Sequence, residues 1–289
     1  MDQVKLPQWL GGLFPFKIKT LKVDDYNLRY VDEGKGPVVV LLHGNPTWSF
    51  YYRNLIKGLK KNYRVIVPDH LGCGLSDKPQ NYPYDLNNHI QNIVSLLKKL
   101  EVQSFRLIVH DWGGAIGMGV ATRDPAKVER LVLLNTAAFT SERIPKRIQI
   151  CRQGKLGEFL VRRLNGFALP ATFMTTVKPL PKNVKQAYLY PYQDYANRVA
   201  VSRFVQDIPM EVNHPSRTLL ESIESKLPAV SCPKLILWGG KDFCFNTEFF
   251  DRWKKIYPEA KSHLFKDAGH YILEDKPEES LQKIQEFLA

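Results

Sequence analysis

One stretch of the sequence, residues 105–119, constrains the fold more than any other. It contains a short apolar run at Leu107–Val109, which is typical of a buried parallel strand. A sharp turn follows at Asp111, and then a helix-like segment with four glycines that begin at Gly113. Because glycine weakens a helix, several glycines in the first turns predict that this helix lies very close to another backbone.

A strand, a tight turn and a close-packed helix together form the nucleophile elbow of an α/β-hydrolase fold. The residue at the tip is Asp111 and not serine, and no G-x-S-x-G occurs in the chain, which argues against a serine esterase. We therefore predict that Asp111 is a nucleophile. The alternative, a structural turn carboxylate, is rare between His and Trp-Gly-Gly.

The rest of the chain alternates strand-like and helix-like segments, which predicts a mostly parallel sheet with helices on both faces. We expect eight strands, at residues 16–23, 27–31, 38–42, 63–67, 107–109, 128–134, 233–238 and 263–265. Helices are expected after the elbow and at residues 48–60, 86–100, 247–256 and 278–288.

The alternation stops between residues 140 and 226, a segment rich in Arg, Phe, Tyr and Leu that predicts helices interrupted by prolines. An insertion between two strands is expected to cover the carboxyl ends of the strands, where such sheets bind ligands. We therefore divide the chain into an α/β-hydrolase core at 1–139 and 227–289 and a helical cap at 140–226.

Three further polar residues follow predicted strands: Asn45, Asp242 and His270. The order nucleophile, acid and histidine is that of the hydrolase fold. Asp111 can form an ester with an electrophilic carbon, and His270 can deprotonate the water that hydrolyses this ester. Asp242 would orient the imidazole. The rival position for the acid, at the end of the preceding strand, carries the neutral Asn135, so Asp242 is preferred over its alternative role as a solvated turn acid.

Asn45 and Trp112 are the expected anion-binding residues. Their backbone N–H groups would form an oxyanion hole. The Asn45 side-chain amide and the Trp112 indole are uncharged donors that could hold a leaving anion in an apolar pocket.

We expect no metal and no organic cofactor, because no ligand-type spacing and no glycine-rich phosphate loop occurs. The scattered cysteines indicate reduced thiols in a cytoplasmic protein; they are Cys73, Cys151, Cys232 and Cys244.

The formal charge is +12, and much of the excess lies in the predicted cap. The cap charge has two interpretations: contact with an acidic partner protein or an anionic membrane, or a solvated basic face, which we favour. No nucleic-acid-binding motif accompanies the charge, so no nucleic-acid partner is expected. The basic residues are Arg143, Lys146, Arg147, Arg152, Lys155, Arg162 and Arg163.

From about residue 25 to the C-terminus, the chain resembles the haloalkane dehalogenase family. The resemblance implies that Asp111 is the nucleophile and that Asn45 and Trp112 are the halide-stabilising pair. The segments that carry it are His43–Ser49, Pro68–Pro79, His110–Gly114 and Asp267–Tyr271.

Three further segments, 134–139, 191–198 and 203–209, resemble the subfamily whose acid follows the seventh strand, as Asp242 does here. That subfamily also contains the β-lactone decarboxylases of bacterial long-chain olefin biosynthesis, which share the same active-site set. The leading expectation is a dehalogenase: Asp111 attacks an alkyl halide, and water activated by His270 hydrolyses the ester to alcohol and halide.

The alternative is a β-lactone decarboxylase that uses the same three residues, and the aromatic, basic cap suits a lipid-like substrate. An epoxide hydrolase is less favoured, because that family usually has an aromatic residue in the place of Asn45. A non-catalytic binding protein is also less favoured, because the nucleophile, acid and base are all intact. In each enzyme the expected substrate is small and apolar or lipid-like.

Overall fold

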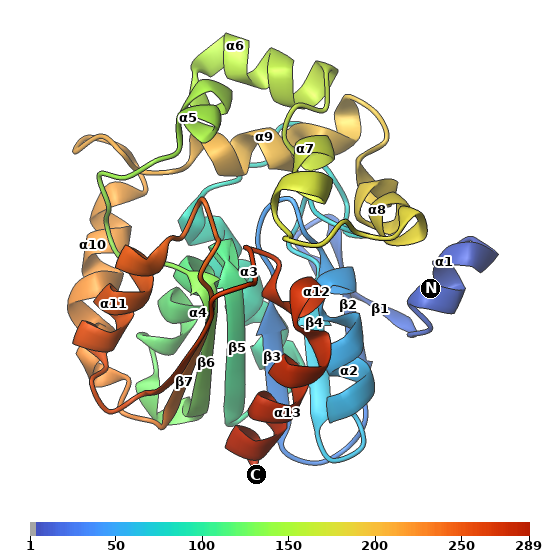
Figure 1. Ribbon diagram of the computed structural model, residues 1–289. Helices are drawn as coiled ribbons and strands as arrows, with labels where there is room; N and C mark the ends of the chain where they lie inside the picture. Colours follow the sequence, from blue (N-terminus) through green and yellow to red (C-terminus); the bar gives the residue numbers. More distant parts are fainter. Residues whose placement is uncertain (1–3) are drawn as a thin grey trace.

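A single eight-stranded sheet forms the centre of the molecule, in the order β1-β2-β4-β3-β5-β6-β7-β8 (Figure 1). The computed structural model describes residues 4–289, so the first three residues of the expected core lie outside the described residues. β1 and β2 form a hairpin, β2 runs antiparallel to β4, and the other neighbours are parallel, which confirms the α/β-hydrolase fold. The strands are β1 Ile18–Val23, β2 Tyr26–Glu33, β3 Val38–Leu42, β4 Arg64–Pro68, β5 Phe105–Asp111, β6 Val128–Thr136, β7 Lys234–Gly239 and β8 Lys261–Phe265.

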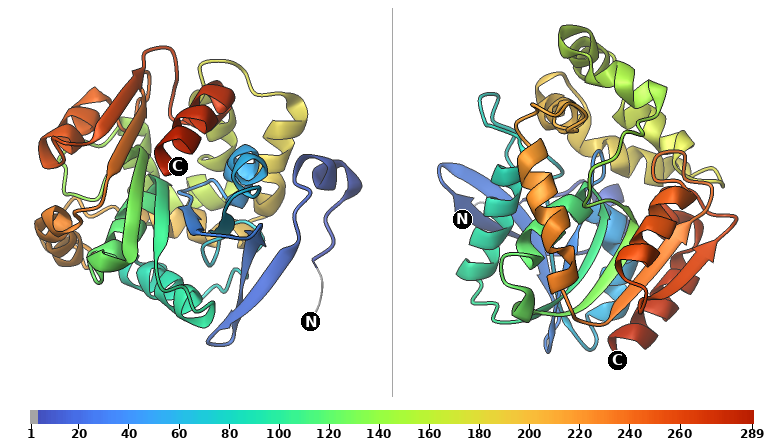
Figure 2. Two further views of the ribbon diagram at one scale, coloured as in Figure 1. Left: turned by 90° about the horizontal axis from the view of Figure 1, so that it is seen from below. Right: turned by 90° about the vertical axis from the view of Figure 1, so that its left-hand side faces the viewer.

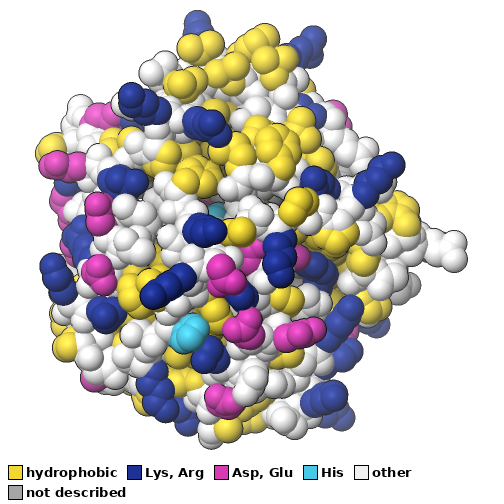
Figure 3. Space-filling view, viewed as in Figure 1, with side chains coloured by type: hydrophobic (Ala, Val, Ile, Leu, Met, Phe, Trp, Pro, Cys, Tyr) yellow, Lys and Arg dark blue, Asp and Glu magenta, His cyan; other side chains and the backbone are white. Residues whose placement is uncertain are grey.

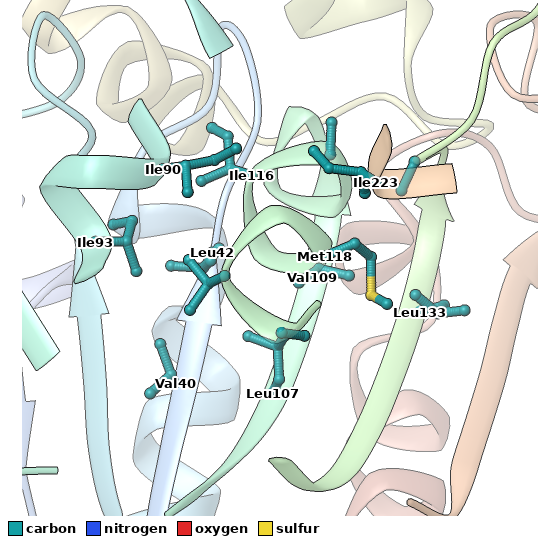
Figure 4. Close-up of a cluster of buried hydrophobic side chains, with 14 of the residues drawn as sticks. Val40, Leu42, Ile90, Ile93, Leu107, Val109, Ile116, Met118, Leu133 and Ile223 are labelled. Atoms are coloured by element: carbon teal, nitrogen blue, oxygen red, sulfur yellow. The ribbon is translucent and has the colours of Figure 1, made fainter. Parts of the chain in front are cut away.

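The central strands bury side chains on both faces, because successive residues of a strand point to opposite sides. On one face Leu42, Leu107 and Val109 join a large apolar cluster with the helices that cover it (Figure 4). On the other face Leu41 and Ile108 belong to a second cluster. Each such side chain contributes about 1.5–3 kcal/mol when it is fully buried.

Two sets of helices cover these two faces. α3, α4, α10 and α11 contribute to the first cluster, and α1, α2 and α13 contribute to the second (Figure 2). α4 approaches the sheet closely at Gly113, where a Cβ atom would overlap the backbone carbonyl of Leu42. The helices of these two sets, together with α12, are α1 Gln8–Leu13, α2 Arg53–Leu59, α3 Leu86–Lys99, α4 Trp112–Ala121, α10 Arg217–Lys226, α11 Thr247–Ile256, α12 Ile272–Asp275 and α13 Pro277–Leu288.

The ends of these helices follow from local hydrogen bonding. α3 begins after Asp85, whose side chain accepts a hydrogen bond from the backbone N–H of Asn88 at 2.8 Å. α11 begins after Asn246, which caps the backbone N–H of Glu248. The short helices beside the core are η1 Ser49–Tyr52, η2 Pro125–Lys127 and η6 Leu227–Ala229.

The segment between β6 and β7 is helical and covers the carboxyl ends of the strands (Figure 1). Arg198 is buried inside it and donates to the backbone carbonyls of Arg162, Tyr192 and Gln193, which explains a charged residue in this position. α10 packs against α4 of the core. The division at residues 140 and 226 stays a prediction. The cap helices are α5 Lys146–Arg152, α6 Gly154–Glu158, η3 Phe159–Arg163, α7 Ala168–Met174, α8 Lys182–Leu189, η4 Tyr190–Tyr192, η5 Ala196–Arg198 and α9 Val199–Gln206.

None of the helices within residues 4–289 combines the length and the apolar character needed to cross a membrane. The four cysteines have no disulfide partner among these residues.

Candidate active site

Asp111 stands at the sharp turn between β5 and α4, with φ of +53° and ψ of −129°. A positive φ is unfavourable for a residue with a Cβ atom, and such backbone strain concentrates at functional sites. The hydroxyl of Thr136 on the neighbouring strand donates to the backbone carbonyl of Asp111 and supports the turn. The turn has the geometry that the sequence predicts for a nucleophile elbow.

One carboxylate oxygen of Asp111 faces backbone donors. Its Oδ1 accepts a hydrogen bond from the backbone N–H of Asn45 at 2.7 Å. The backbone N–H of Trp112 also stabilises the charged form of the carboxylate. Only glycine fits at position 44, because a Cβ atom there would overlap Asp111 Oδ1. The Asn45 N–H, one of the two expected oxyanion donors, therefore lies beside the oxygen that would become the carbonyl oxygen of an Asp111 ester.

The other carboxylate oxygen faces the histidine. Asp111 Oδ2 lies 3.5 Å from His270 Nε2, and His270 Nδ1 lies 2.7 Å from Asp242 Oδ2. All three side chains are buried. The structure thus brings together three residues that are spread along the sequence between positions 111 and 270.

Asn135, the neutral residue at the rival position for the acid, holds Asp242 in place. Asn135 Nδ2 donates to Asp242 Oδ2 at 2.9 Å, and Asn135 also exchanges hydrogen bonds with the backbone of Gly239. The backbone N–H of Cys244 donates to Asp242 Oδ1 at 2.7 Å. The only sequence evidence for Asn135 was its position at the end of the strand beside β7.

The charges of the site are strongly coupled. Burial lowers the pKa of His270, but the carboxylates of Asp242 and Asp111 outweigh this effect and raise the pKa to about 10. Burial also raises the pKa of Asp111, but its hydrogen bond to His270 and the nearby charge keep the pKa below its ordinary value. Asp111 is therefore ionised and His270 protonated in the resting site at neutral pH.

His110 supports His270 without entering this charge network. Its Nε2 lies 2.9 Å from the backbone carbonyl of His270, and the two rings lie 4.5 Å apart. Burial lowers the pKa of His110 to about 3, so this imidazole is neutral and donates the bond. His110 therefore has a structural role, which is to position His270.

The side-chain donors of Asn45 and Trp112 differ in whether they already have a protein acceptor. Asn45 Nδ2 donates to the backbone carbonyl of Val201 in the cap at 3.1 Å, which leaves one amide hydrogen for a ligand. The Trp112 ring lines a cavity and lies 5.3 Å from the ring of Phe204. We find no protein acceptor for its indole N–H among residues 4–289. Trp112 is thus the freer of the two expected anion donors.

Two cavities meet at Asp111. The smaller has a volume of about 140 Å³ and passes between Trp112, Leu220 and Phe249. The larger has a volume of about 420 Å³ and passes under the cap beside Ala171 and Phe173. Both have mainly apolar walls. Asn45, Asp111, Ile148, Phe167 and Cys244 line both.

The described part of the chain contains no group of three His, Cys or carboxylate residues arranged to hold a metal ion. The groups that line the site are a carboxylate, an imidazolium and uncharged donors beside apolar walls.

Comparison with known proteins adds to this geometry. The model of a family described as "alpha/beta hydrolase fold" matches residues 37–277. A cis-3-alkyl-4-alkyloxetan-2-one decarboxylase of Shewanella oneidensis is 44% identical, over 97% of this chain and 91% of its own. A protein of the same name from Xanthomonas campestris is 40% identical, over 90% of this chain and 92% of its own.

Dehalogenases are also similar to this chain. Haloalkane dehalogenase 2 of Mycobacterium tuberculosis is 30% identical, over 92% of this chain and 93% of its own. Among solved structures, a putative ancestral haloalkane dehalogenase matches with a TM-score of 0.86 and 25% identity, over 93% of this chain and 98% of its own.

Proposed function

The chain belongs to the alpha/beta hydrolase fold family, in the group that contains oxetanone decarboxylases and haloalkane dehalogenases, and from this premise we propose that it is a β-lactone decarboxylase. Its substrate would be an oxetan-2-one, a four-membered lactone, with an alkyl chain on each of the two sp³ ring carbons. The products would be an alkene and carbon dioxide.

In the first step Asp111 Oδ2 attacks the sp³ ring carbon that is bonded to the ring oxygen, and not the carbonyl carbon. A new carbon–oxygen bond forms, and the bond between this carbon and the ring oxygen breaks. The electron pair of the broken bond stays on the ring oxygen, which becomes the second oxygen of a free carboxylate. Asp111 Oδ1, held by the Asn45 N–H, becomes the ester carbonyl oxygen. The substrate carboxylate appears in a site that already holds a protonated His270 and the indole donor of Trp112.

In the second step the ester fragments. The bond between the carboxylate and the adjacent ring carbon breaks, and carbon dioxide leaves. The released electron pair forms the carbon–carbon double bond and expels Asp111 as a carboxylate. No water, proton or oxidant is consumed, so the enzyme returns to its starting state. Both developing charges lie where donors are already placed, which is how such sites lower a barrier.

The observation that carries this proposal is the meeting of two apolar cavities at Asp111. A lactone substituted on both ring carbons has two alkyl arms that diverge from the reacting centre. One arm fits each cavity, and the reacting carbon then lies beside Asp111. A linear haloalkane has one arm and needs one cavity.

The sequence identities of the relatives also favour the decarboxylase over the dehalogenase. The two decarboxylases are 44% and 40% identical to this chain, whereas the M. tuberculosis dehalogenase is 30% identical. We therefore rank the decarboxylase first, which reverses the order expected from the sequence alone.

Haloalkane dehalogenation is the second candidate. It is favoured by Trp112, which lines the same cavity as Asp111 and whose indole N–H has no protein acceptor within residues 4–289. In that reaction Asp111 displaces a halide, the donors hold the halide, and water hydrolyses the ester. Loss of the Asp111 charge on ester formation would lower the pKa of His270, which then becomes a usable base.

The test supplies a cis-3,4-dialkyl β-lactone and a 1-bromoalkane in parallel to the purified protein. We expect alkene and carbon dioxide from the lactone, and little or no alcohol and bromide from the bromoalkane. Asp111→Asn should abolish alkene formation while its circular dichroism stays unchanged. Fast bromide release with an untouched lactone would support the dehalogenase instead.

Two cavity variants test the placement of the arms, and each is the control for the other. Ala137→Phe obstructs the smaller cavity and Ala171→Phe the larger. Each should lower kcat/KM for lactones whose two arms are both long, by roughly tenfold or more. Short-armed lactones should be turned over normally by both. Equal effects on all lactones and bromoalkanes would contradict the two-arm arrangement.

A further inference from the structure

We propose that the outer face of the cap docks on an anionic lipid surface, so that the larger cavity opens against the lipid. The docking is argued from the surface alone; the entry of a lipid-like substrate there rests on the proposed function. We call this surface the outer cap face. Its exposed apolar members are Ile150, Leu156, Phe159, Leu164, Leu169, Phe173 and Val177.

The first observation is the concentration of exposed apolar side chains. These seven are 41–57% exposed, and they all fall within residues 150–177. The rest of the described chain has only four other exposed large apolar side chains, at Trp9, Tyr195, Val212 and Phe243. Surface apolar residues that gather in one place, and are not scattered singly, mark an interaction site.

The second observation is the single sign of the charge on the same segment. Residues 146–178 carry seven Lys and Arg and one acid, Glu158, which pairs with Arg162. Lys155 and Arg163 are exposed, and neither forms an ion pair with another residue within 4–289. Figure 3 shows apolar and basic side chains together over the cap at the top of the view, with little acidic colour among them.

The third observation connects this face to the active site. Ile150 and Phe173 are exposed on the outer cap face and also line the larger cavity that reaches Asp111. Arg147 lies beside them on the wall of the same cavity. The cavity mouth therefore lies among the apolar and basic side chains.

An anionic lipid surface is the occupant that fits these three observations. Apolar side chains among cations on short helices are typical of segments that lie in a membrane interface. Each Lys or Arg near an anionic bilayer adds to the attraction between the protein and the lipid surface. A second copy of this chain fits poorly, because the same positive face would meet itself. From the sequence we favoured a solvated basic face. Because exposed apolar side chains lie among these cations, we now interpret the cap charge as part of a lipid-docking surface.

The test is co-sedimentation of the full chain with vesicles, measured without substrate. One set of vesicles is pure phosphatidylcholine, and the other contains about one-third phosphatidylglycerol. We expect binding to the anionic vesicles and a loss of binding in high salt.

Two double variants address the two parts of the surface. Lys155→Glu with Arg163→Glu should weaken binding by at least about tenfold. Leu156→Ser with Phe159→Ser should weaken it by a similar factor, because both apolar contacts are removed. None of these residues lines a cavity, so turnover of a short, water-soluble lactone should be unchanged.

Matched controls lie elsewhere on the surface. Lys254→Glu with Lys255→Glu on α11 changes the net charge equally, and Val212→Ser removes an exposed apolar side chain outside the cap face. Both should bind like the parent protein. Equal loss in the controls, or no binding to anionic vesicles, would overturn the proposal, as would a protein that self-associates through this face. A protein that decarboxylates the lactone but does not bind vesicles would contradict the docking proposal alone. A protein that binds vesicles but does not decarboxylate the lactone would contradict the proposed function alone.

Discussion

The Nε2 atom of His270 lies 3.5 Å from Oδ2 of Asp111, while Oδ1 of the same carboxylate is held by the backbone N–H of Asn45. The two oxygens of Asp111 thus have different surroundings. The oxygen beside the imidazolium is free to attack, and the other is already in the position of an ester carbonyl. As long as Asp111 is ionised, it helps to hold the proton on His270. Ester formation removes that charge and makes His270 a better base.

His270→Gln should therefore affect the two candidate reactions differently. Ester hydrolysis needs a base, so we expect the variant to accumulate a covalent alkyl-enzyme with a reactive bromoalkane, visible as a mass increase. Lactone decarboxylation needs no water, so alkene formation should fall by less than the roughly hundredfold cost of losing a general base. Complete loss of alkene formation in a folded variant would contradict the fragmentation route.

Asp242→Asn should lower the pKa of His270 from about 10 toward its ordinary value, because it removes one of the two carboxylates that stabilise the imidazolium. A raised pKa in the folded state stabilises the protein fully below about pH 6.5, and this stabilisation is lost as pH rises through about 10. In the variant the stabilisation should be smaller, and its loss should be complete at a lower pH. Titration of His270 by NMR and urea unfolding at several pH values measure both effects.

Asp251→Asn, an exposed carboxylate on α11, is the matched control and should leave both measurements unchanged. An unaltered His270 titration in Asp242→Asn would remove Asp242 from its assigned role.

Asn45→Ala and Trp112→Phe each remove one side-chain donor beside Asp111. We expect each to slow the first chemical step by about 2–4 kcal/mol in activation free energy and to weaken halide binding. Trp112→Phe should have the larger effect on bromide binding, because Asn45 shares its amide with Val201. Bromide quenching of tryptophan fluorescence and single-turnover rates are the measurements. Trp9→Phe, on α1 far from the cavities, serves as control, and identical behaviour of Trp112→Phe and this control would refute the assignment.

Gly44→Ala tests the packing of Asp111 directly. The added methyl group would overlap Asp111 Oδ1, so the carboxylate must move away from the backbone donors. We expect activity to fall at least a hundredfold, together with a loss of roughly 1–3 kcal/mol in the free energy of unfolding. At Gly12 an added Cβ atom meets nothing within 4 Å, so Gly12→Ala should keep full activity and a slightly more stable helix. Normal activity in Gly44→Ala would contradict the described geometry.

The fold, and the residues that meet in the candidate site, could be predicted because they depend on local patterns. The apolar run at Val38–Leu42 and the amphipathic helix at Thr247–Ile256 have the predicted bounds in the structure. Asp111 was located by the glycines that follow it, since only a close-packed helix needs them.

Other features depend on contacts between distant segments, which leave no local pattern. The hydrogen bond from Asn135 to Asp242 spans 107 positions, and that from Asn45 to Val201 spans 156. The outer cap face could not be predicted from the sequence either, because an apolar residue such as Phe159 has the same sequence pattern whether it faces the core or the solvent.

The most direct test of the account is a single turnover of a cis-3,4-dialkyl β-lactone with excess protein in heavy-oxygen water. If Asp111 attacks the ring carbon and the ester fragments, the product is an alkene and peptide mass analysis finds no heavy oxygen in Asp111. If water instead attacks an Asp111 ester, the product is a hydroxy acid and Asp111 carries the label, which would contradict the proposed decarboxylation.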